Sequence, residues 1–419
     1  MKLELPEIQA AREYLAQFSQ VKEAEDQESL SQVMDILQNV RKYGDNALFE
    51  YTEKFDGQKL EKFKVPETWL EQSYLALEPE LRQALEFIKQ RIQKYEEQIK
   101  YKDKELTEFK YVYHPIEKVG FYVPGGTALY PSSVLMSIIA AQVAGVPKIY
   151  AVTPTFEENN ITFATLYICG VTNVYQIGGA QAIAALAYGT ESIPKVDKIV
   201  GPGNRYVALA KRLVFGEVGI DSIAGPSEIL LYIDENVDPE SITLDIFAQA
   251  EHDPDAKTFL LAENKKILKD IHALIVKKLP EQKRSDIITQ SINNNHYSII
   301  GEAKDLIAII NQIAPEHVSI QHANSDEIIS KIHYAGAIFK GNYSPEAIGD
   351  YVAGPSHVLP TSGSARFSHG LNVNDFLTSH AIIDIEPETY QQIAPYGIKV
   401  AYAEGLYAHA ESLEARLKE

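Results

Sequence analysis

This 419-residue chain contains a single cysteine, Cys169, so no disulfide can form within it. It also lacks any apolar run close to the roughly 20 residues that a membrane-spanning helix requires. Basic residues are scarce beside acidic ones, 39 against 58, and the net charge is −19. This charge argues against nucleic acid or an anionic membrane as the main partner, and it suits a cationic small molecule better.

The N-terminus has no basic segment followed by an apolar one, because Met1–Pro6 leads straight into charged sequence. We therefore expect a cytoplasmic protein. The length allows two to four domains of roughly 150 residues each. Residues 7 to about 100 predict helices with apolar stripes, notably over 29–55 and 79–100, and we interpret these helices as packing elements.

Strand-like and helix-like segments alternate from Tyr111 onward, a pattern typical of βαβ units and a parallel sheet. A first series has expected strands at 120–123, 148–153, 174–177 and 198–200, with helices at 132–144, 164–169, 180–188 and 204–215. A second series has strands at 229–233, 257–262, 297–301, 318–321 and 337–340, with helices at 238–252, 264–278, 303–313 and 326–335. The two series predict two similar α/β domains, followed by a loop over 354–370 and a tail over 373–419 that ends in a helix.

Three strands of the first series end in glycine-rich turns, at Pro124–Gly126, Gly178–Gln181 and Gly201–Asn204. Such turns let the backbone approach a phosphate or sugar at the start of the next helix, although many are only tight turns. No Gly-x-Gly-x-x-Gly pattern follows any of these strands. A dinucleotide bound here would therefore not bind in the standard Rossmann manner.

Gln249 and His252 are three residues apart at the end of an expected helix, so they share one face of it. An amide oxygen beside an imidazole can bind a metal, but a polar helix end that faces water has the same pattern. Cys169 lies in an apolar stretch, which predicts a buried structural thiol and not a nucleophile.

Glu316 and His317 are adjacent where a helix passes into a strand, and such a pair can divide acid–base work. A solvated turn is the alternative for this pair. Two other carboxylate–imidazole pairs, Asp350 with His357 and Glu404 with His409, can equally be solvated surface groups.

Eight motifs in this order resemble the histidinol dehydrogenase family over nearly the whole chain. They are Tyr122–Gly126, Gly178–Ala184, Gly201–Asn204, Ala224–Glu228, Gln249–His252, Ala314–His317, Gly349–Tyr351 and His357–Thr361. Each motif alone is modest, but the ordered set is specific.

The resemblance implies NAD-dependent oxidation of L-histidinol to L-histidine through the aldehyde, the last step of histidine biosynthesis. It implies a zinc ion held by Gln249, His252, Asp350 and His409, the last from the partner subunit of a domain-swapped homodimer. Substrate-binding positions would be Ser227, Gln249, His252, His317, Asp350, His357, Glu404 and His409. Positions that touch NAD would be Tyr122, Gln181 and Asn204. We expect His317 to take the hydroxyl proton and Glu316 to activate water.

We predict a helical arm at 1–20 and a discontinuous α/β domain, formed by 21–119 with 230–372, that carries the metal and catalytic residues. A second, NAD-binding α/β domain is expected at 120–229, and a tail at 373–419 is expected to swap onto the partner. Both domains would be incomplete Rossmann-like parallel sheets. The competing functions are an NAD-dependent dehydrogenase of another amino or sulfonated alcohol, a zinc hydrolase that does not use NAD, and a non-catalytic scaffold.

Overall fold

The computed structural model describes residues 27–125, 130–158, 160–223 and 225–417, so the expected arm at 1–20 lies outside the described residues. The chain forms two compact units. The larger contains the chain up to Ile99 together with Ile116–Phe376, and the smaller contains Lys100–Pro115 and Leu377–Glu419. Within the described ranges, no helix is both long enough and apolar enough to cross a membrane.

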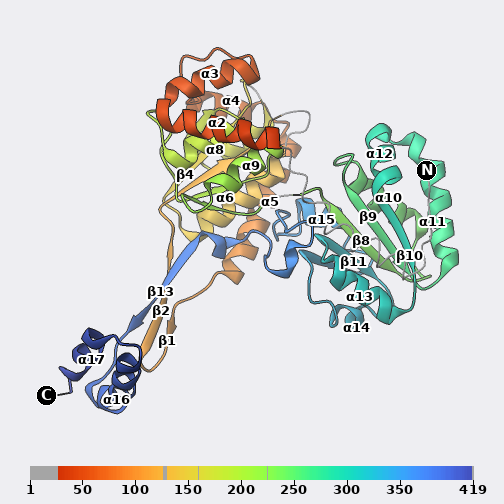
Figure 1. Ribbon diagram of the computed structural model, residues 1–419. Coiled ribbons are helices and arrows are strands. Elements are labelled where there is room, and N and C mark those ends of the chain that lie inside the picture. The colour runs from red at the N-terminus through yellow and green to blue at the C-terminus, as the bar shows by residue number, and fades with distance from the viewer. Residues whose placement is uncertain (1–26, 126–129, 159, 224, 418–419) are drawn as a thin grey trace. The chain divides into compact units, whose positions relative to one another are not determined.

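The first sheet of the larger unit has five parallel strands in the order β5-β4-β3-β6-β7. Figure 1 labels its strand β4. The strands are β3 (Lys118–Tyr122), β4 (Lys148–Thr153), β5 (Val174–Gln176), β6 (Lys198–Val200) and β7 (Gly219–Ile220). The helices between them are α6 (Pro131–Ala144), α7 (Ile161–Ile168), α8 (Gly179–Tyr188) and α9 (Arg205–Val214).

The second sheet of this unit is also parallel and has the order β10-β9-β8-β11-β12. Its strands are β8 (Glu228–Ile233), β9 (Lys257–Ala262), β10 (His296–Ile300), β11 (His317–Gln321) and β12 (Ala337–Lys340). Its helices are α10 (Pro239–Ala250), α11 (Lys265–Lys278), α12 (Ser285–Asn295), α13 (Ala303–Ile313), α14 (Ser325–Ile329) and α15 (Glu346–Tyr351).

The two sheets share one topology. Numbered along the chain within each sheet, the strands follow the spatial order 3-2-1-4-5, which is that of the first five strands of a Rossmann fold. The apolar runs explain this arrangement, because a parallel sheet covered on both faces buries continuous apolar strands such as β8. The α/β class with two similar parallel sheets is confirmed.

From residue 27 onward, where the description begins, four helices precede the first sheet: α2 (Gln27–Tyr43), α3 (Asp45–Asp56), α4 (Glu67–Leu75) and α5 (Pro79–Ile99). The apolar stripe over 29–55 belongs to two helices, because Gly44 adopts φ 54° between them. Val33 and Leu48 from α2 and α3 belong to the same core as Val152 of β4 and Ile183 of α8. These two helices therefore cover the first sheet, a packing partner that the sequence pattern did not indicate.

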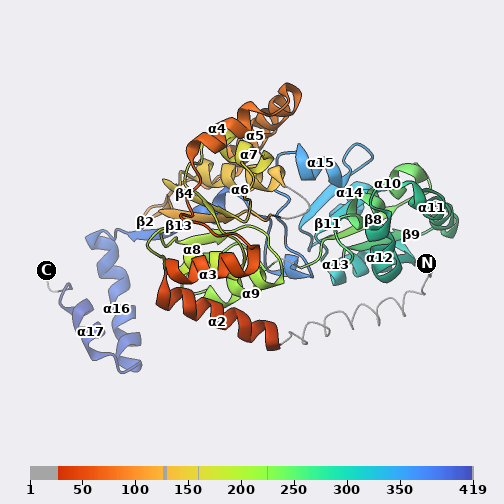
Figure 2. The same cartoon turned by 90° about the horizontal axis from the view of Figure 1, so that it is seen from above.

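The smaller unit is an antiparallel sheet with two helices. Strand β2 (Phe109–Pro115) lies between β1 (Lys104–Glu105) and β13 (Leu377–Ile383). Helices α16 (Pro387–Ala403) and α17 (Tyr407–Glu414) follow and pack against each other (Figure 2). The tail expected at 373–419 thus contributes a strand as well as helices, and this strand pairs with a segment about 260 residues earlier in the chain.

Two further local expectations need correction. The helix expected over 326–335 ends at Ile329, because the chain must turn back before β12. A Cβ atom on Gly336 would lie 2.5 Å from the carbonyl oxygen of Glu316, so this turn passes too close for any other residue. The helix α15 lies in a region for which no element was predicted. The domain limits at 20, 119, 229 and 372 remain a prediction.

Candidate active site

Glu316 and His317 lie at the start of β11, between β8 and β12, in the second sheet. Both side chains are buried, with residue exposures of 5% and 4%. The alternative of a solvated turn is therefore wrong for this pair. A buried carboxyl and a buried imidazole are costly unless the protein satisfies them, so their partners reveal what the site requires.

The backbone of Glu228, the first residue of β8, serves both side chains. Its N–H donates to Oε2 of Glu316 over 2.9 Å, and its carbonyl oxygen lies 3.1 Å from Nδ1 of His317. The Glu228 side chain is held in turn by Lys257, whose Nζ donates to Oε1 over 2.9 Å. The parallel pairing of β8 with β11 therefore fixes the positions of the two candidate catalytic residues.

Burial changes the proton affinity of both groups. It raises the pKa of the Glu316 carboxyl well above its ordinary value, despite the opposing hydrogen bond from Glu228. Burial, with smaller contributions from the nearby His357 and His252, lowers the pKa of His317 to about 3. His317 is therefore a neutral imidazole, and Glu316 is a stronger base than an ordinary carboxylate once it is ionised.

Glu346, the first residue of α15, was not among the predicted site residues. It is 3% exposed, and its Oε1 lies 3.2 Å from Nδ1 of His317. Burial raises the pKa of Glu346 well above its ordinary value, and the neighbouring Asp350 and Glu316 raise it further. Its spacing of four residues from Asp350 was the available signal, since a helix over this segment places both carboxyls on one face.

A group of three side chains from α15 and the end of α10 could bind a metal ion. One donor atom from each of His252, Glu346 and Asp350 lies within 4.8 Å of the others. Nε2 of His252 is 4.0 Å from Oδ2 of Asp350. Gly349 lets α15 approach the sheet closely, because a Cβ atom there would lie 2.5 Å from the ring of Phe339.

Gln249 lies on the last turn of α10 and is fully buried. Neither its Oε1 nor its Nε2 has a hydrogen-bond partner among the described residues. His252 follows the helix, and its N–H donates to the carbonyl oxygen of Gln249 over 3.3 Å. Because an unpaired buried amide is costly, the free oxygen of Gln249 fits a metal ligand better than a structural role. The donor set, an amide oxygen, an imidazole and carboxylates, suits zinc.

His357 joins this site from the loop after α15. Its Nδ1 lies 3.9 Å from Oδ1 of Asp350, and its Nε2 is 2.9 Å from Oγ of Ser133 on α6. Burial, with a smaller contribution from the nearby His252, lowers the pKa of His357 to about 4. The pairs Glu316–His317 and Asp350–His357 thus converge in one place, although they are 33 to 41 residues apart in the chain.

The three expected cofactor positions lie at the carboxyl ends of strands in the first sheet. Tyr122 ends β3, and its hydroxyl oxygen accepts a hydrogen bond from Gly179 N–H over 3.2 Å. Gln181 lies in the first turn of α8, two residues after Gly179. It is 1% exposed, and its Oε1 has no hydrogen-bond partner within the described ranges. Asn204 follows β6 and caps α9, accepting hydrogen bonds from Tyr206 and Val207. Strands β3 and β6 are neighbours, so these positions share the edge at which such sheets bind ligands.

The remaining predicted residues are placed as follows. Ser227 directly precedes β8, and its carbonyl oxygen accepts from Lys257 N–H over 2.9 Å. Glu404 and His409 lie in the smaller unit, at the end of α16 and on α17, and both are exposed. Cys169 is buried, and burial raises its pKa to about 12, as expected for a structural thiol.

Comparisons with known proteins agree with this arrangement. Residues 19–417 match the family model for histidinol dehydrogenase. A histidinol dehydrogenase from Staphylococcus saprophyticus is 50% identical over 388 residues, which cover 92% of each chain. One from Staphylococcus epidermidis is 49% identical and covers 97% of this chain and 99% of its own.

A solved structure supports the same relationship. The crystal structure of histidinol dehydrogenase from Elizabethkingia anophelis superposes with a TM-score of 0.91 at 35% sequence identity, and the match covers 94% of this chain and 93% of the other. The shared fold therefore extends over nearly the full length of both proteins. With the family model, the curated relatives and this structure in agreement, the chain belongs to the histidinol dehydrogenase family of enzymes.

Proposed function

We propose that this enzyme oxidises L-histidinol to L-histidine through L-histidinal, in two successive hydride transfers to NAD. Family membership supports this substrate, since the relatives are named histidinol dehydrogenases. The observation that carries the proposal is that Glu316 and His317 are both buried. In the same site, side-chain oxygens of Gln249 and Glu346 have no hydrogen-bond partner within the described chain and are therefore available to a metal ion. The cytoplasmic location is part of the same proposal.

His252, Asp350 and Gln249 would hold a zinc ion, with His409 of a second copy as the fourth ligand. Glu346 is close enough to join or support this set. Zinc, when bound, supplies a redox-inert Lewis acid that grips the substrate nitrogens and orients the alcohol. His357 and Ser227 would contact the substrate beside it, together with Glu404.

His317 would accept the hydroxyl proton at Nε2. Its Nδ1 faces two oxygen acceptors, the Glu228 carbonyl and Glu346 Oε1, so the ring proton belongs on Nδ1. Nε2, which has no partner among the described residues, is then the free lone pair of a neutral imidazole. General-base assistance of this kind contributes about 100- to 10,000-fold to a rate.

Glu316 would activate the water that attacks the bound aldehyde. In its ionised form the carboxylate would accept one proton of the water while the water oxygen bonds to the carbonyl carbon. The carbonyl oxygen would take the electron pair of the broken C=O π bond and become the alkoxide of the hydrate, and this hydrate anion would be the substrate of the second oxidation. The raised pKa of this buried carboxyl makes it a better proton acceptor than an exposed one, provided that it is ionised. A covalent thiohemiacetal route is disfavoured because the only thiol, Cys169, is buried.

Tyr122, Gln181 and Asn204 would bind NAD at the strand edge of the first sheet. NAD, when bound, supplies the hydride acceptor for each of the two oxidations. Oε1 of Gln181, which has no hydrogen-bond partner in the described part of the chain, would accept a hydrogen bond from the dinucleotide. The glycine-rich turns would let the dinucleotide come close to the backbone.

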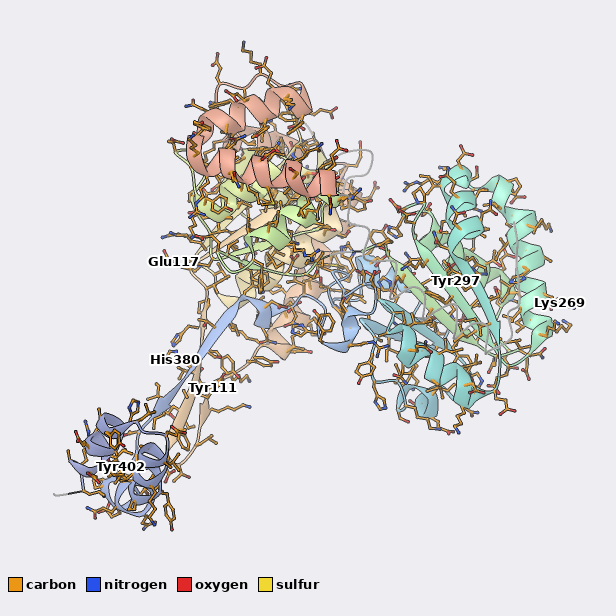
Figure 3. The ribbon with its side chains drawn as sticks, in the orientation of Figure 1. Tyr111, Glu117, Lys269, Tyr297, His380 and Tyr402 are labelled. Carbon is orange, nitrogen blue, oxygen red and sulfur yellow. The ribbon has the colours of Figure 1, made fainter. Side chains whose placement is uncertain are left out.

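The surface of the smaller unit supports the proposed homodimer. Its helices and strands leave many large apolar side chains exposed, including Tyr111 and Tyr402, which Figure 3 labels. Others are Tyr101, Leu106, Phe109, Ile382, Ile383, Ile393, Tyr396, Val400, Leu406 and Tyr407. So much apolar surface on a unit of this size is typical of an interface, and a second copy of this chain would cover it. Glu404 and His409 would then enter the partner's site.

One assay tests the proposal. Purified protein with L-histidinol and NAD should form about two NADH per histidine, and removal of metal by a chelator followed by added zinc should abolish and restore this turnover. Faster turnover of another amino or sulfonated alcohol would favour the competing dehydrogenase. Metal-dependent hydrolysis without NADH formation would replace the proposal with a hydrolase.

A further inference from the structure

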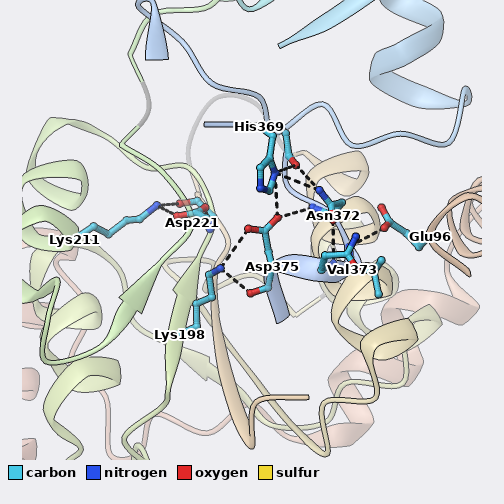
Figure 4. Close-up of polar contacts among 11 residues, drawn as sticks. Glu96, Lys198, Lys211, Asp221, His369, Asn372, Val373 and Asp375 are labelled. Carbon is cyan, nitrogen blue, oxygen red and sulfur yellow. Dashed lines mark hydrogen bonds and ion pairs between the residues drawn. The ribbon is translucent and has the colours of Figure 1, made fainter. Parts of the chain in front are cut away.

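Lys211 and Asp221 form a buried ion pair beside the first sheet (Figure 4). Lys211 lies on α9 and Asp221 directly follows β7. The side chains of both residues are 4% exposed, so neither charge is available to solvent. Removing two charges from water is expensive, and a well-packed apolar pair is often no less stable than a buried ion pair. Stability alone therefore does not explain why this pair is present.

The pair binds both polar atoms of one backbone residue, Gly201. The N–H of Gly201 donates to Oδ2 of Asp221 over 2.8 Å. Its carbonyl oxygen accepts from Nζ of Lys211 over 3.0 Å. The opposite side of Gly201 is equally constrained, since φ is 124° and a Cβ atom would lie 2.1 Å from the carbonyl oxygen of Tyr122. Gly201 is therefore held between Tyr122 and the ion pair.

This residue begins the turn from Gly201 to Asn204. Gly201 and Pro202 line a small cavity together with Tyr122 and Ser133. Asn204, three residues after Gly201, caps α9. A displacement of Gly201 would therefore move both the cavity wall and the start of the helix.

We propose that the buried Lys211–Asp221 pair is a positioning device for the cofactor turn: by holding the N–H and C=O of Gly201, it fixes the Gly201–Asn204 turn against Tyr122 for binding the nicotinamide dinucleotide. This inference rests on the proposed use of NAD. Both side chains are buried, so we expect them to act through Gly201 and not by touching the cofactor. Neither residue belongs to the candidate site of the second sheet, so we expect the pair to affect cofactor affinity and not substrate binding.

The test uses NADH binding to the full-length, zinc-loaded protein, followed by NADH fluorescence, with L-histidinol binding measured separately by calorimetry. The main variant is Lys211→Met/Asp221→Leu, which removes both charges and both contacts to Gly201 without leaving an unpaired buried charge. Lys211→Arg, which keeps the ion pair but changes the donor geometry at the Gly201 carbonyl, is the second variant.

Lys198→Met is the matched control. Lys198 lies at the start of β6, whereas Gly201 follows its end, and its Nζ donates to the carbonyl oxygen of Asp375 over 2.7 Å (Figure 4). This variant removes the ion pair between Lys198 and Asp375, which belongs to the strand that precedes Gly201. Lys198 itself does not hold the Gly201–Asn204 turn.

We expect the double variant to fold with a lower melting temperature than wild type, because the buried N–H and C=O of Gly201 lose these partners. It should bind NADH about tenfold more weakly, the effect of one or two lost hydrogen bonds. Histidinol affinity should stay unchanged, and Lys198→Met should bind NADH normally. Unchanged NADH affinity in the double variant would overturn the inference, and so would a parallel loss of NADH and histidinol binding. If the double variant does not fold, the Lys211→Arg variant tests the inference instead. Wild-type NADH affinity in Lys211→Arg would then overturn the inference. Failure of wild type itself to bind NADH would instead overturn the proposed cofactor.

Discussion

Nδ1 of His317 lies 3.2 Å from Oε1 of Glu346, although the two residues are 29 positions apart and belong to different elements. Glu346 thereby joins the proposed general base to the helix that carries Asp350. The carboxyl oxygen and the Glu228 carbonyl both favour the proton on Nδ1, which leaves Nε2 as the acceptor. The orientation of the base and the position of the metal-binding group therefore depend on the same short helix.

Glu346→Ala should lower kcat for histidinol oxidation about 10- to 100-fold, the usual effect of losing a group that orients a functional imidazole or metal ligand. Steady-state kinetics measure the loss. The control is Glu327→Ala, which removes an exposed glutamate from the neighbouring helix α14, where it pairs only weakly with Lys331. A kcat within twofold of wild type for Glu346→Ala would rule out its positioning role.

Glu316→Gln should slow the oxidation of added L-histidinal at least about 100-fold while affecting the alcohol step much less. The amide retains the volume of the side chain and an oxygen that can accept from Glu228 N–H, but it cannot accept a proton from water. Single-turnover measurements with each substrate separate the steps. Equal losses on both steps would remove Glu316 from the water-activating role.

Gln249→Leu should reduce zinc affinity about 10- to 100-fold, because it replaces an amide that has no partner in the described structure by an apolar group of similar size. The measurement is the zinc content after dialysis against a competing chelator. Gln90→Leu, at an exposed position on α5, is the control. Zinc retention equal to wild type would exclude Gln249 as a ligand.

Mixing His252→Asn chains with His409→Asn chains should restore activity to about a quarter of wild type, although each variant alone is impaired. Random pairing makes half of the dimers mixed, and each mixed dimer has one site with both histidines intact. Refolding the two chains together and assaying NADH formation gives the result. No recovery above the separate variants would mean that each site draws both histidines from one chain.

Glu96 makes stability depend on pH, independently of catalysis. It is fully buried, and its Oε2 accepts from Val373 N–H over 2.7 Å (Figure 4). Burial, with a smaller contribution from Asp375, raises its pKa from 4.5 to about 7. The folded state therefore binds the proton more tightly than the unfolded state, so this stabilisation is complete below pH 4.5 and is lost as the pH rises through about 7.

Glu96→Gln should accordingly remove this dependence. Between pH 5 and pH 8 its melting temperature should fall less than that of wild type. The corresponding difference in the free energy of unfolding is up to about 3 kcal/mol. Glu97→Gln, the exposed neighbour on α5, should retain the wild-type pH dependence. Parallel melting curves for wild type and Glu96→Gln across this range would contradict the assignment.

Local patterns were enough to predict most of both sheets. Apolar runs such as Ile229–Ile233 and Lys257–Ala262 are strands because they are short, apolar and bounded by turn-forming residues. Asp238–Pro239 marks the start of α10, where the aspartate caps the helix and the proline occupies its first turn. The pairing of β2 with β13 could not be found in this way, because the two strands are brought together only by the fold.

For the candidate site as well, some features follow from the sequence and others only from the tertiary structure. The residue types and motif order of this chain, from Tyr122 through Gln249–His252 to Glu316–His317, were sufficient to indicate the family and the chemistry, since covalent structure alone sets which donors and bases are available. Packing decided the other features. These are the burial of Glu316, the contact of Glu346 with His317, and the hydrogen bonds of Lys211 and Asp221 with Gly201. Proton affinity, tautomer and backbone position depend on neighbours distant in the chain, and these neighbours exist only once the strands have assembled.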